Sequence, residues 1–125
     1  MKKIRIVAIT LVVFFYAGIG FAQTTPELEE AKKLTVREQY TQAEEMFKKL
    51  IIANPGLGDL YYYYGENELK ALFSDTITRS QKETLANCKK LYEQGIEKDA
   101  LNPLNFVGLA RIAYISGNKQ AVGEN

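Results

Sequence analysis

The stretch YTQAEEMFKKLIIANPGLGDLYYYYGENEL, residues Tyr40 to Leu69, decides how this chain folds. In its first half, apolar residues recur at the spacing of one helix face, and glutamates and lysines occupy the opposite face. An amphipathic helix is therefore predicted. Asn54-Pro55-Gly56 ends this helix, because the residue before a proline avoids helical dihedrals and glycine tolerates unusual ones. A second helix is expected to follow, with Asp59 as its cap.

Small and bulky residues follow a recognisable order in this stretch. Ala43 precedes Phe47 by four positions, Pro55 stands at the corner, and Tyr61 precedes the pair Tyr64-Gly65. This order resembles the tetratricopeptide repeat, whose signature is W-x2-L-G-x2-Y…A-x3-F…P. The resemblance implies an all-α fold in which antiparallel helix hairpins stack as a short right-handed superhelix.

Comparison of the chain with itself reveals a second copy of the pattern. Shifted by 45 residues, Phe47 aligns with Tyr92 and Ala43 with Cys88, while Gly65 aligns with Ala110 and Tyr61 with Phe106. Small residues therefore align with small ones and bulky residues with bulky ones. The offset is longer than the 34 residues of a tetratricopeptide unit and lies in the range of HEAT-like repeats, which are the competing assignment.

The tetratricopeptide interpretation needs an insertion in the second unit. We expect the first helix of that unit to extend through Leu72 and Phe73, and a longer loop to follow it. Ser80 and Glu83 form a capping box that opens the next helix, predicted from Gln81 to about Lys98. The predicted domain, residues 23–125, then holds about two and a half repeats: 24–57, 58–102 with an insertion near 70–79, and a partial repeat at 103–125. Thr25 and Pro26 are expected to start its first helix.

The first 22 residues have the organisation of a secretory signal peptide. Lys2, Lys3 and Arg5 precede an apolar run that begins at Ile6 and ends in small residues up to Ala22. Cleavage after Ala22 would place the mature protein in the periplasm or elsewhere in the bacterial cell envelope. The alternative is an uncleaved segment that anchors the protein to the membrane.

Composition argues against several classes of function. Loss of the three basic residues of the signal changes the net charge from +1 to −2, and lysines elsewhere alternate with glutamates, so we expect no nucleic-acid binding. The chain has no histidine and one cysteine, Cys88, which leaves no histidine-based catalysis and no zinc site. We therefore expect no enzyme activity, no cofactor and no metal, and we assign Cys88 to packing.

The last helix is predicted from Pro103 to Ser116, with Asn102 as its cap and a turn at Gly117-Asn118. Its single charged residue is Arg111, so we expect the helix to be buried on more than one side. Two explanations follow. Either the sequence is part of a longer repeat protein, or another molecule covers this helix.

The resemblance implies a module that binds a protein or peptide on the concave face formed by the first helix of each unit. The family's groove-lining positions fall here on eight residues: Leu28, Lys32, Tyr62, Glu66, Leu69, Val107, Arg111 and Tyr114. Six of these are expected to contact the partner: Lys32, Tyr62, Glu66, Leu69, Arg111 and Tyr114. Two other functions stay open. The chain could be a structural subunit of an envelope complex that self-associates through the last helix, or the regulatory N-terminal part of a longer enzyme.

Overall fold

The computed structural model describes residues 25–123, with the surroundings of side chains described as far as Gly117. Within that range the chain is all-α, as predicted, and contains no strand. The helices are α2 (Pro26–Val36), α3 (Tyr40–Ala53), α4 (Gly58–Ser74), α5 (Gln81–Lys98) and α6 (Leu104–Gly123). The predicted signal peptide lies outside the described residues. In the part that is described, no helix is long and apolar enough to cross a membrane.

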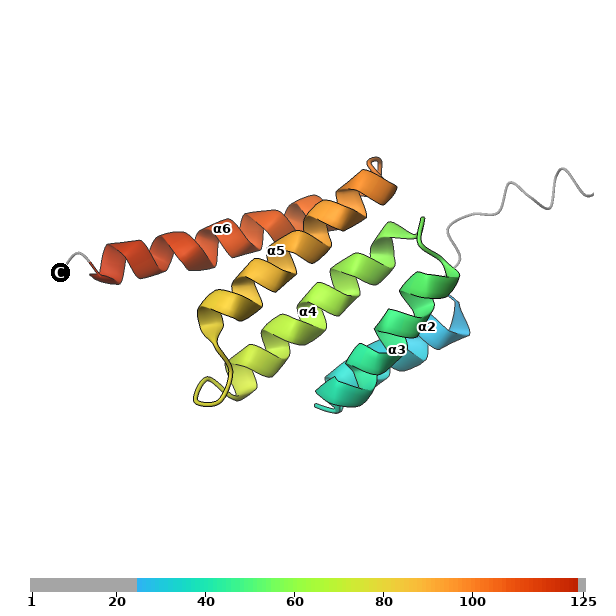
Figure 1. Ribbon diagram of the computed structural model, residues 1–125, viewed down its shortest axis with the longest axis horizontal. Coiled ribbons are helices and arrows are strands. Elements are labelled where there is room, and N and C mark those ends of the chain that lie inside the picture. Colours follow the sequence, from blue (N-terminus) through green and yellow to red (C-terminus); the bar gives the residue numbers. More distant parts are fainter. Residues whose placement is uncertain (1–24, 124–125) are drawn as a thin grey trace, which may run out of the picture.

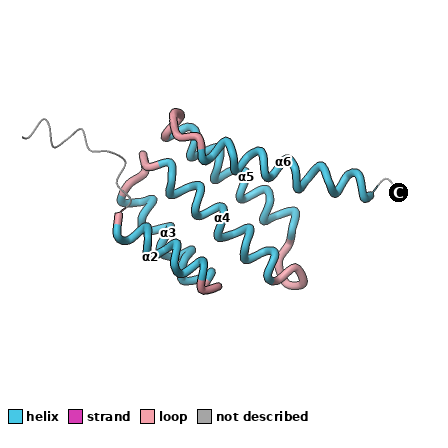
Figure 2. The backbone as a smooth tube through the Cα atoms, turned by 180° about the vertical axis from the view of Figure 1, so that it is seen from behind, coloured by secondary structure: helices cyan, strands magenta, loops and turns pink. Residues whose placement is uncertain are grey.

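Helix α4 lies at the centre of the molecule. Each helix packs against the next one in the chain, and α4 also contacts α2 and α6, which are its second neighbours in sequence. Figure 1 shows α4 and α5 side by side, with α2 and α3 on one flank and α6 on the other, and Figure 2 shows the same order from behind. The first helix of each predicted unit therefore touches the first helix of the next.

The apolar core has two clusters that meet along α4. Phe47 of α3 and Leu28 of α2 are fully buried in the first cluster, together with Leu60 from the start of α4. Tyr92 and Cys88 of α5 are fully buried in the second, together with Leu69 from the middle of α4. Packing is thus the role of Cys88, as predicted, and α4 joins the two clusters.

Tyr92 is the largest fully buried side chain of the second cluster, and two glycines make room for it. A Cβ atom at Gly65 of α4 would lie 2.5 Å from Tyr92 Cε1, and one at Gly108 of α6 would lie 2.6 Å from the same ring. The Tyr92 ring therefore fills a space between α4 and α6. Any side chain larger than glycine at Gly65 or Gly108 would overlap with the ring.

The predicted helix starts at Thr25 and Ser80 are confirmed. Thr25 Oγ1 accepts a hydrogen bond from Leu28 N at 3.2 Å, and Ser80 Oγ accepts one from Glu83 N at 3.3 Å. Each side chain satisfies a backbone donor that the first helical turn leaves without a partner. Helix α4 also extends through Leu72 and Phe73 as expected, and a loop at residues 75–80 follows it.

Asp59 does not cap α4, which corrects the prediction. The helix begins one residue earlier, at Gly58, and the Gly58 amide donates a hydrogen bond to Asp99 Oδ2 at 3.2 Å. Asp59 instead accepts a hydrogen bond from Asn102, which also caps α6 by accepting one from Leu104 N at 3.0 Å. Asp99, which is distant in sequence, therefore accepts the hydrogen bond at the start of α4, and Asp59 does not.

Two predictions about the last helix are wrong. Helix α6 continues through Gly117 and Asn118 to Gly123, because Gly117 keeps a negative φ and an internal glycine costs a helix only about 1 kcal/mol. The helix is also not enclosed by the described residues. Phe106, Val107 and Tyr114 are 51%, 52% and 70% exposed, since α4 and α5 cover a single side of it.

Candidate functional site

Five side chains from α2, α4 and α6 form a connected row across the first helices of the predicted units: Lys32, Tyr62, Tyr63, Glu66 and Arg111. We call them the α2–α4–α6 row. Each helix is held in place by the core beneath it, so the row rests on packed elements and not on loops. A site on rigid helices binds with a smaller loss of conformational entropy than a site on loops.

Lys32 forms the α2 end of the row. Its ammonium group lies 4.5 Å from the centroid of the Tyr63 ring and 3.0 Å from Glu29 Oε1. The hydrogen bond that Lys32 donates to Glu29 raises the pKa of Lys32, and the negative charge of Glu29 acts in the same direction, while burial opposes both. Glu29 and the Tyr63 ring therefore fix the position of the Lys32 ammonium group, and part of the Lys32 side chain stays open to solvent.

Of the four consecutive tyrosines, Tyr61 is buried, and the other three are half-buried against the core clusters although successive helical residues rotate by 100°. Tyr61 is buried and donates a hydrogen bond to Pro55 O at 2.8 Å, and Tyr64 stacks on Phe47 with 6.0 Å between ring centroids. Tyr62 and Tyr63 are half-buried and meet edge to face at 5.2 Å. Burial raises the pKa of Tyr62, and the nearby Glu66 carboxylate raises it further. Both rings therefore present apolar area together with a hydroxyl group.

Glu66 links the middle of the row to its α6 end. Tyr92 Oη donates a hydrogen bond to Glu66 Oε1 at 3.1 Å, and Arg111 donates to the other carboxylate oxygen. The Glu66 side chain is 14% exposed and that of Arg111 is 44% exposed. Because both oxygens of Glu66 have partners within the protein, the donors that face outward belong to Arg111.

A small cavity of about 110 Å³ opens beside the row, between α2 and α4. Tyr63, Val36 and Phe47 are its apolar lining residues, and Lys32 and Lys70 line it as well. A buried hydrogen bond of 2.8 Å from Thr35 Oγ1 to Asn67 Oδ1 ties α2 to α4 beneath it. Asn67 also donates to Tyr40 O at 3.0 Å, so the start of α3 is fastened at the same point. The cavity matches one side chain in size.

The structure brings together four of the six residues predicted to contact a partner: Lys32, Tyr62, Glu66 and Arg111. Tyr114 lies on α6 and is 70% exposed, but it makes no recorded contact with these four. Leu69 is 2% exposed and belongs to the second core cluster, so its prediction as a contact residue is corrected. A rotation of 100° per residue places Leu69 toward α5, whereas Lys70 lies toward the cavity.

Sequence reasoning did not assign Tyr63, Lys70 and Val36 to the site. Lys70 follows Glu66 by four residues, so helical spacing alone could have placed it on the same face. The contact of Tyr63 with Lys32 depends on how α2 crosses α4. The position of Val36 at the cavity also depends on how α2 crosses α4, so the sequence around Val36 could not have indicated it.

The row carries groups that can make non-covalent contacts. It offers two aromatic surfaces, a cation at each end, and tyrosine hydroxyl groups. Within residues 25–123, no group of three or more His, Cys, Asp or Glu side chains is arranged to hold a metal ion. Comparison with protein-family models, with curated proteins and with solved structures finds no match for this chain.

Proposed function

We propose that this chain is a tetratricopeptide-like module of the bacterial cell envelope that binds a segment of another protein along the α2–α4–α6 row. The helix hairpins would stack as a short right-handed superhelix with the row on its inner face. In this proposal the protein recognises a partner and performs no catalysis. A secretory signal at residues 1–22 would bring it to the envelope.

The observation that carries this proposal is the continuity of the row. The Lys32–Tyr63 contact joins α2 to α4, and the Arg111–Glu66 ion pair joins α4 to α6, with Tyr62 between them. Tyrosine and arginine are the side chains most often found to dominate binding energy at protein interfaces. Fixed in place before binding, they would lose little rotamer entropy when a partner arrives.

Selection of displayed random peptides on the full chain tests the proposal. We expect convergent peptides whose affinity falls about tenfold or more in Tyr63→Ala and Arg111→Ala, because each variant removes a side chain of the row at one helix junction. Circular dichroism should show unchanged helical content in both variants. Tenfold in affinity corresponds to about 1.4 kcal/mol.

Lys49→Ala provides the matched control, since Lys49 is exposed on α3 and takes no part in the row. It should bind the selected peptides as well as the original chain does. Peptides that bind the Tyr63 and Arg111 variants with undiminished affinity would show that recognition occurs elsewhere, and the proposal would be abandoned.

A further inference from the structure

Helix α6 carries an exposed seam of four residues: Phe106, Ala110, Ala113 and Gly117. They are separated by four, three and four positions, which is the spacing of the residues that meet in a coiled coil. All four are exposed, and a Cβ atom at Gly117 would meet nothing within 4 Å. The seam lies on the side of α6 that faces away from α4 and α5.

The packing of α4 shows what such a face accommodates. Gly65 of α4 aligns with Ala110 of α6 in the internal repeat, and Tyr61 aligns with Phe106. On α4 this face is covered by α5, which places the Tyr92 ring directly over Gly65. On α6, no helix of residues 25–123 covers the corresponding face. The seam is therefore built like a helix-packing surface and lacks the helix.

Charge narrows the class of molecule that can cover the seam. From Leu104 to Gly117 the one charged side chain is Arg111, which points to the flank of α6 and pairs with Glu66 of its own chain. The seam thus offers no charge to attract an acidic or a basic helix, and it repels neither. Its best match is another uncharged helix face that places small residues opposite large ones.

The order of residues along the seam supplies that match in a second copy of the chain. In an antiparallel helix pair, Phe106 of each copy faces Gly117 of the second copy, and Ala110 faces Ala113 of the second copy. Each large side chain then meets a glycine, and the alanines allow close approach of the two helices. A parallel pair would instead place Phe106 on Phe106. A two-fold axis repeats every contact, as an isologous interface requires.

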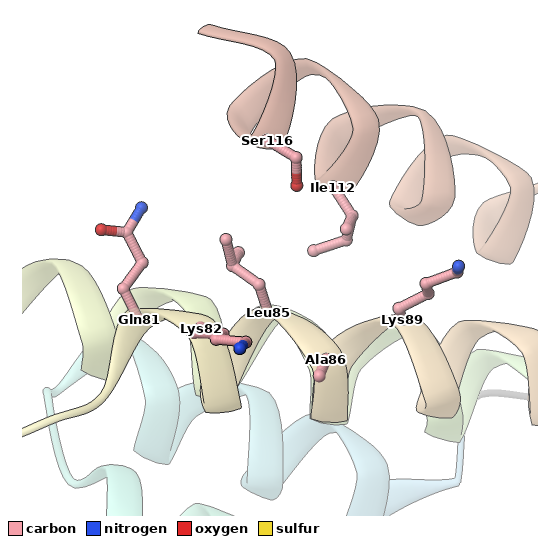
Figure 3. Close-up of a pocket in the computed structure, with 7 residues that line it drawn as sticks. All are labelled: Gln81, Lys82, Leu85, Ala86, Lys89, Ile112 and Ser116. Atoms are coloured by element: carbon pink, nitrogen blue, oxygen red, sulfur yellow. The ribbon is translucent and has the colours of Figure 1, made fainter. Parts of the chain in front are cut away.

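We propose that α6 pairs with α6 of a second copy in this antiparallel register and forms a two-fold dimer. Val107 and Tyr114, which are 52% and 70% exposed, follow one flank of the seam, and in this register Val107 of each copy would lie beside Tyr114 of the second copy. The other flank borders an open groove of about 320 Å³ between α5 and α6, where Leu85 and Ile112 point toward each other and Ser116 lies near the rim (Figure 3).

The exposed area indicates a weak dimer. Phe106 and Tyr114 together would bury on the order of 250 Å² per copy. The rest of the seam, Val107 and the groove edge would bring the pair close to about 1,000 Å², the lower end for a specific interface. A dissociation constant in the micromolar range is therefore expected, and the surface is separate from the α2–α4–α6 row.

Analytical ultracentrifugation of the full chain over a range of concentrations tests the dimer and its register. The original chain should change from monomer to dimer within the micromolar range. Ala110→Glu and Ala113→Lys should each weaken self-association by about tenfold or more, because each places two unpaired charges in the seam. An equimolar mixture of these two variants should recover dimer, since the carboxylate introduced by the first variant then faces the ammonium group introduced by the second across one layer.

Ile52→Glu is the matched control, because Ile52 is an exposed apolar residue of α3 that is 82% accessible and far from α6 in the chain. It should associate as the original chain does. A chain that is monomeric at every concentration, or an Ala110→Glu variant that associates normally, would overturn the proposal. Recovery in the mixture excludes misfolding as the reason for weaker association of the single variants.

Discussion

At the scale of single residues, burial controls the ionisation of three neighbouring side chains. Burial raises the pKa of the Cys88 thiol to about 12, and the Glu68 carboxylate acts in the same direction. Burial also raises the pKa of Tyr64, and Glu44 and then Glu68 raise it further. Glu68 itself has a raised pKa, chiefly because of burial and then because of the Glu44 carboxylate, although Arg79 lies 3.7 Å away. The charged form of Glu68 is therefore disfavoured in the folded protein.

Glu68→Gln should raise the midpoint temperature of unfolding at pH 7. A raised carboxyl pKa means that the folded protein binds the proton more readily than the unfolded chain, so stability falls as pH rises from about 4 through the folded pKa. The glutamine variant escapes this loss at pH 7 and should match the original chain near pH 4. Thermal unfolding followed by circular dichroism measures both values.

Exposed Glu45 of α3 provides the comparison, because Glu45→Gln removes the same charge without the burial. Its unfolding midpoint should stay within a degree or so of the original at both pH values. Equal midpoints for Glu68→Gln and the original chain at pH 7 would show that Arg79 compensates fully for the burial of Glu68.

At the scale of elements, the position of α5 between α4 and α6 depends on glycines that meet Tyr92. Gly65 also accepts a hydrogen bond at its carbonyl from the Cys88 thiol at 3.5 Å. Helices α4 and α5 therefore approach closely at Gly65, where α5 places the Tyr92 ring and the small Cys88 side chain one helical turn apart. This contact holds the Tyr92 hydroxyl against Glu66 and so supports the α2–α4–α6 row from below.

Gly65→Ala should destabilise the protein by roughly 1 to 3 kcal/mol, the usual cost of overpacking a core. The added methyl group would lie within 2.8 Å of Tyr92 Cε1, Cζ and Oη, and the ring has no free side to move into because Gly108 lies against it. Chemical denaturation gives the free energy of unfolding. Adding Tyr92→Leu to Gly65→Ala should cost less than the sum of the two single changes, because the shorter side chain leaves room for the methyl group.

Gly56→Ala is the control for this prediction, since a Cβ atom there meets nothing within 4 Å and the residue does not have a positive φ. It should change the free energy of unfolding by less than about 0.5 kcal/mol. Strict additivity in the double variant would mean that the close approach of Gly65 to Tyr92 carries no energetic weight.

At the scale of the whole molecule, stability depends on α4. It contributes Leu60 to the first core cluster and Leu69 and Leu72 to the second, and it contacts every other described helix. Helices at the two ends of such an array have fewer neighbours, as in repeat proteins, where each unit gains stability from the units beside it.

Amide hydrogen exchange should therefore be slowest in α4 and clearly faster in α6 beyond Tyr114. Opening of α6 exposes one side of one helix, whereas opening of α4 separates both core clusters. Mass spectrometry of exchanged peptides, at concentrations below the dimerisation range, measures the difference. Equal protection of α6 and α4 in the monomer would show that α6 is covered more fully than its exposed side chains indicate.

The local sequence was sufficient for the helical class and for most helix boundaries. Periodic apolar residues, the caps at Thr25 and Ser80, and the Asn54-Pro55 corner act within a few residues of their own position, so they can be interpreted without knowledge of the fold. The expectation that Cys88 serves packing followed from its alignment with Ala43.

The tertiary structure alone decided how the helices cross, and with that the candidate site. Contact between Lys32 and Tyr63, the pairing of Arg111 with Glu66, and the burial of Leu69 all join residues from different helices or depend on which neighbour covers a helix face. The continuation of α6 past Gly117 and the exposure of its seam were also decided by the tertiary structure. A glycine at position 117 is compatible both with a turn and with the interior of a helix. Long-range packing chose between these outcomes because the local differences in energy are only about 1 kcal/mol.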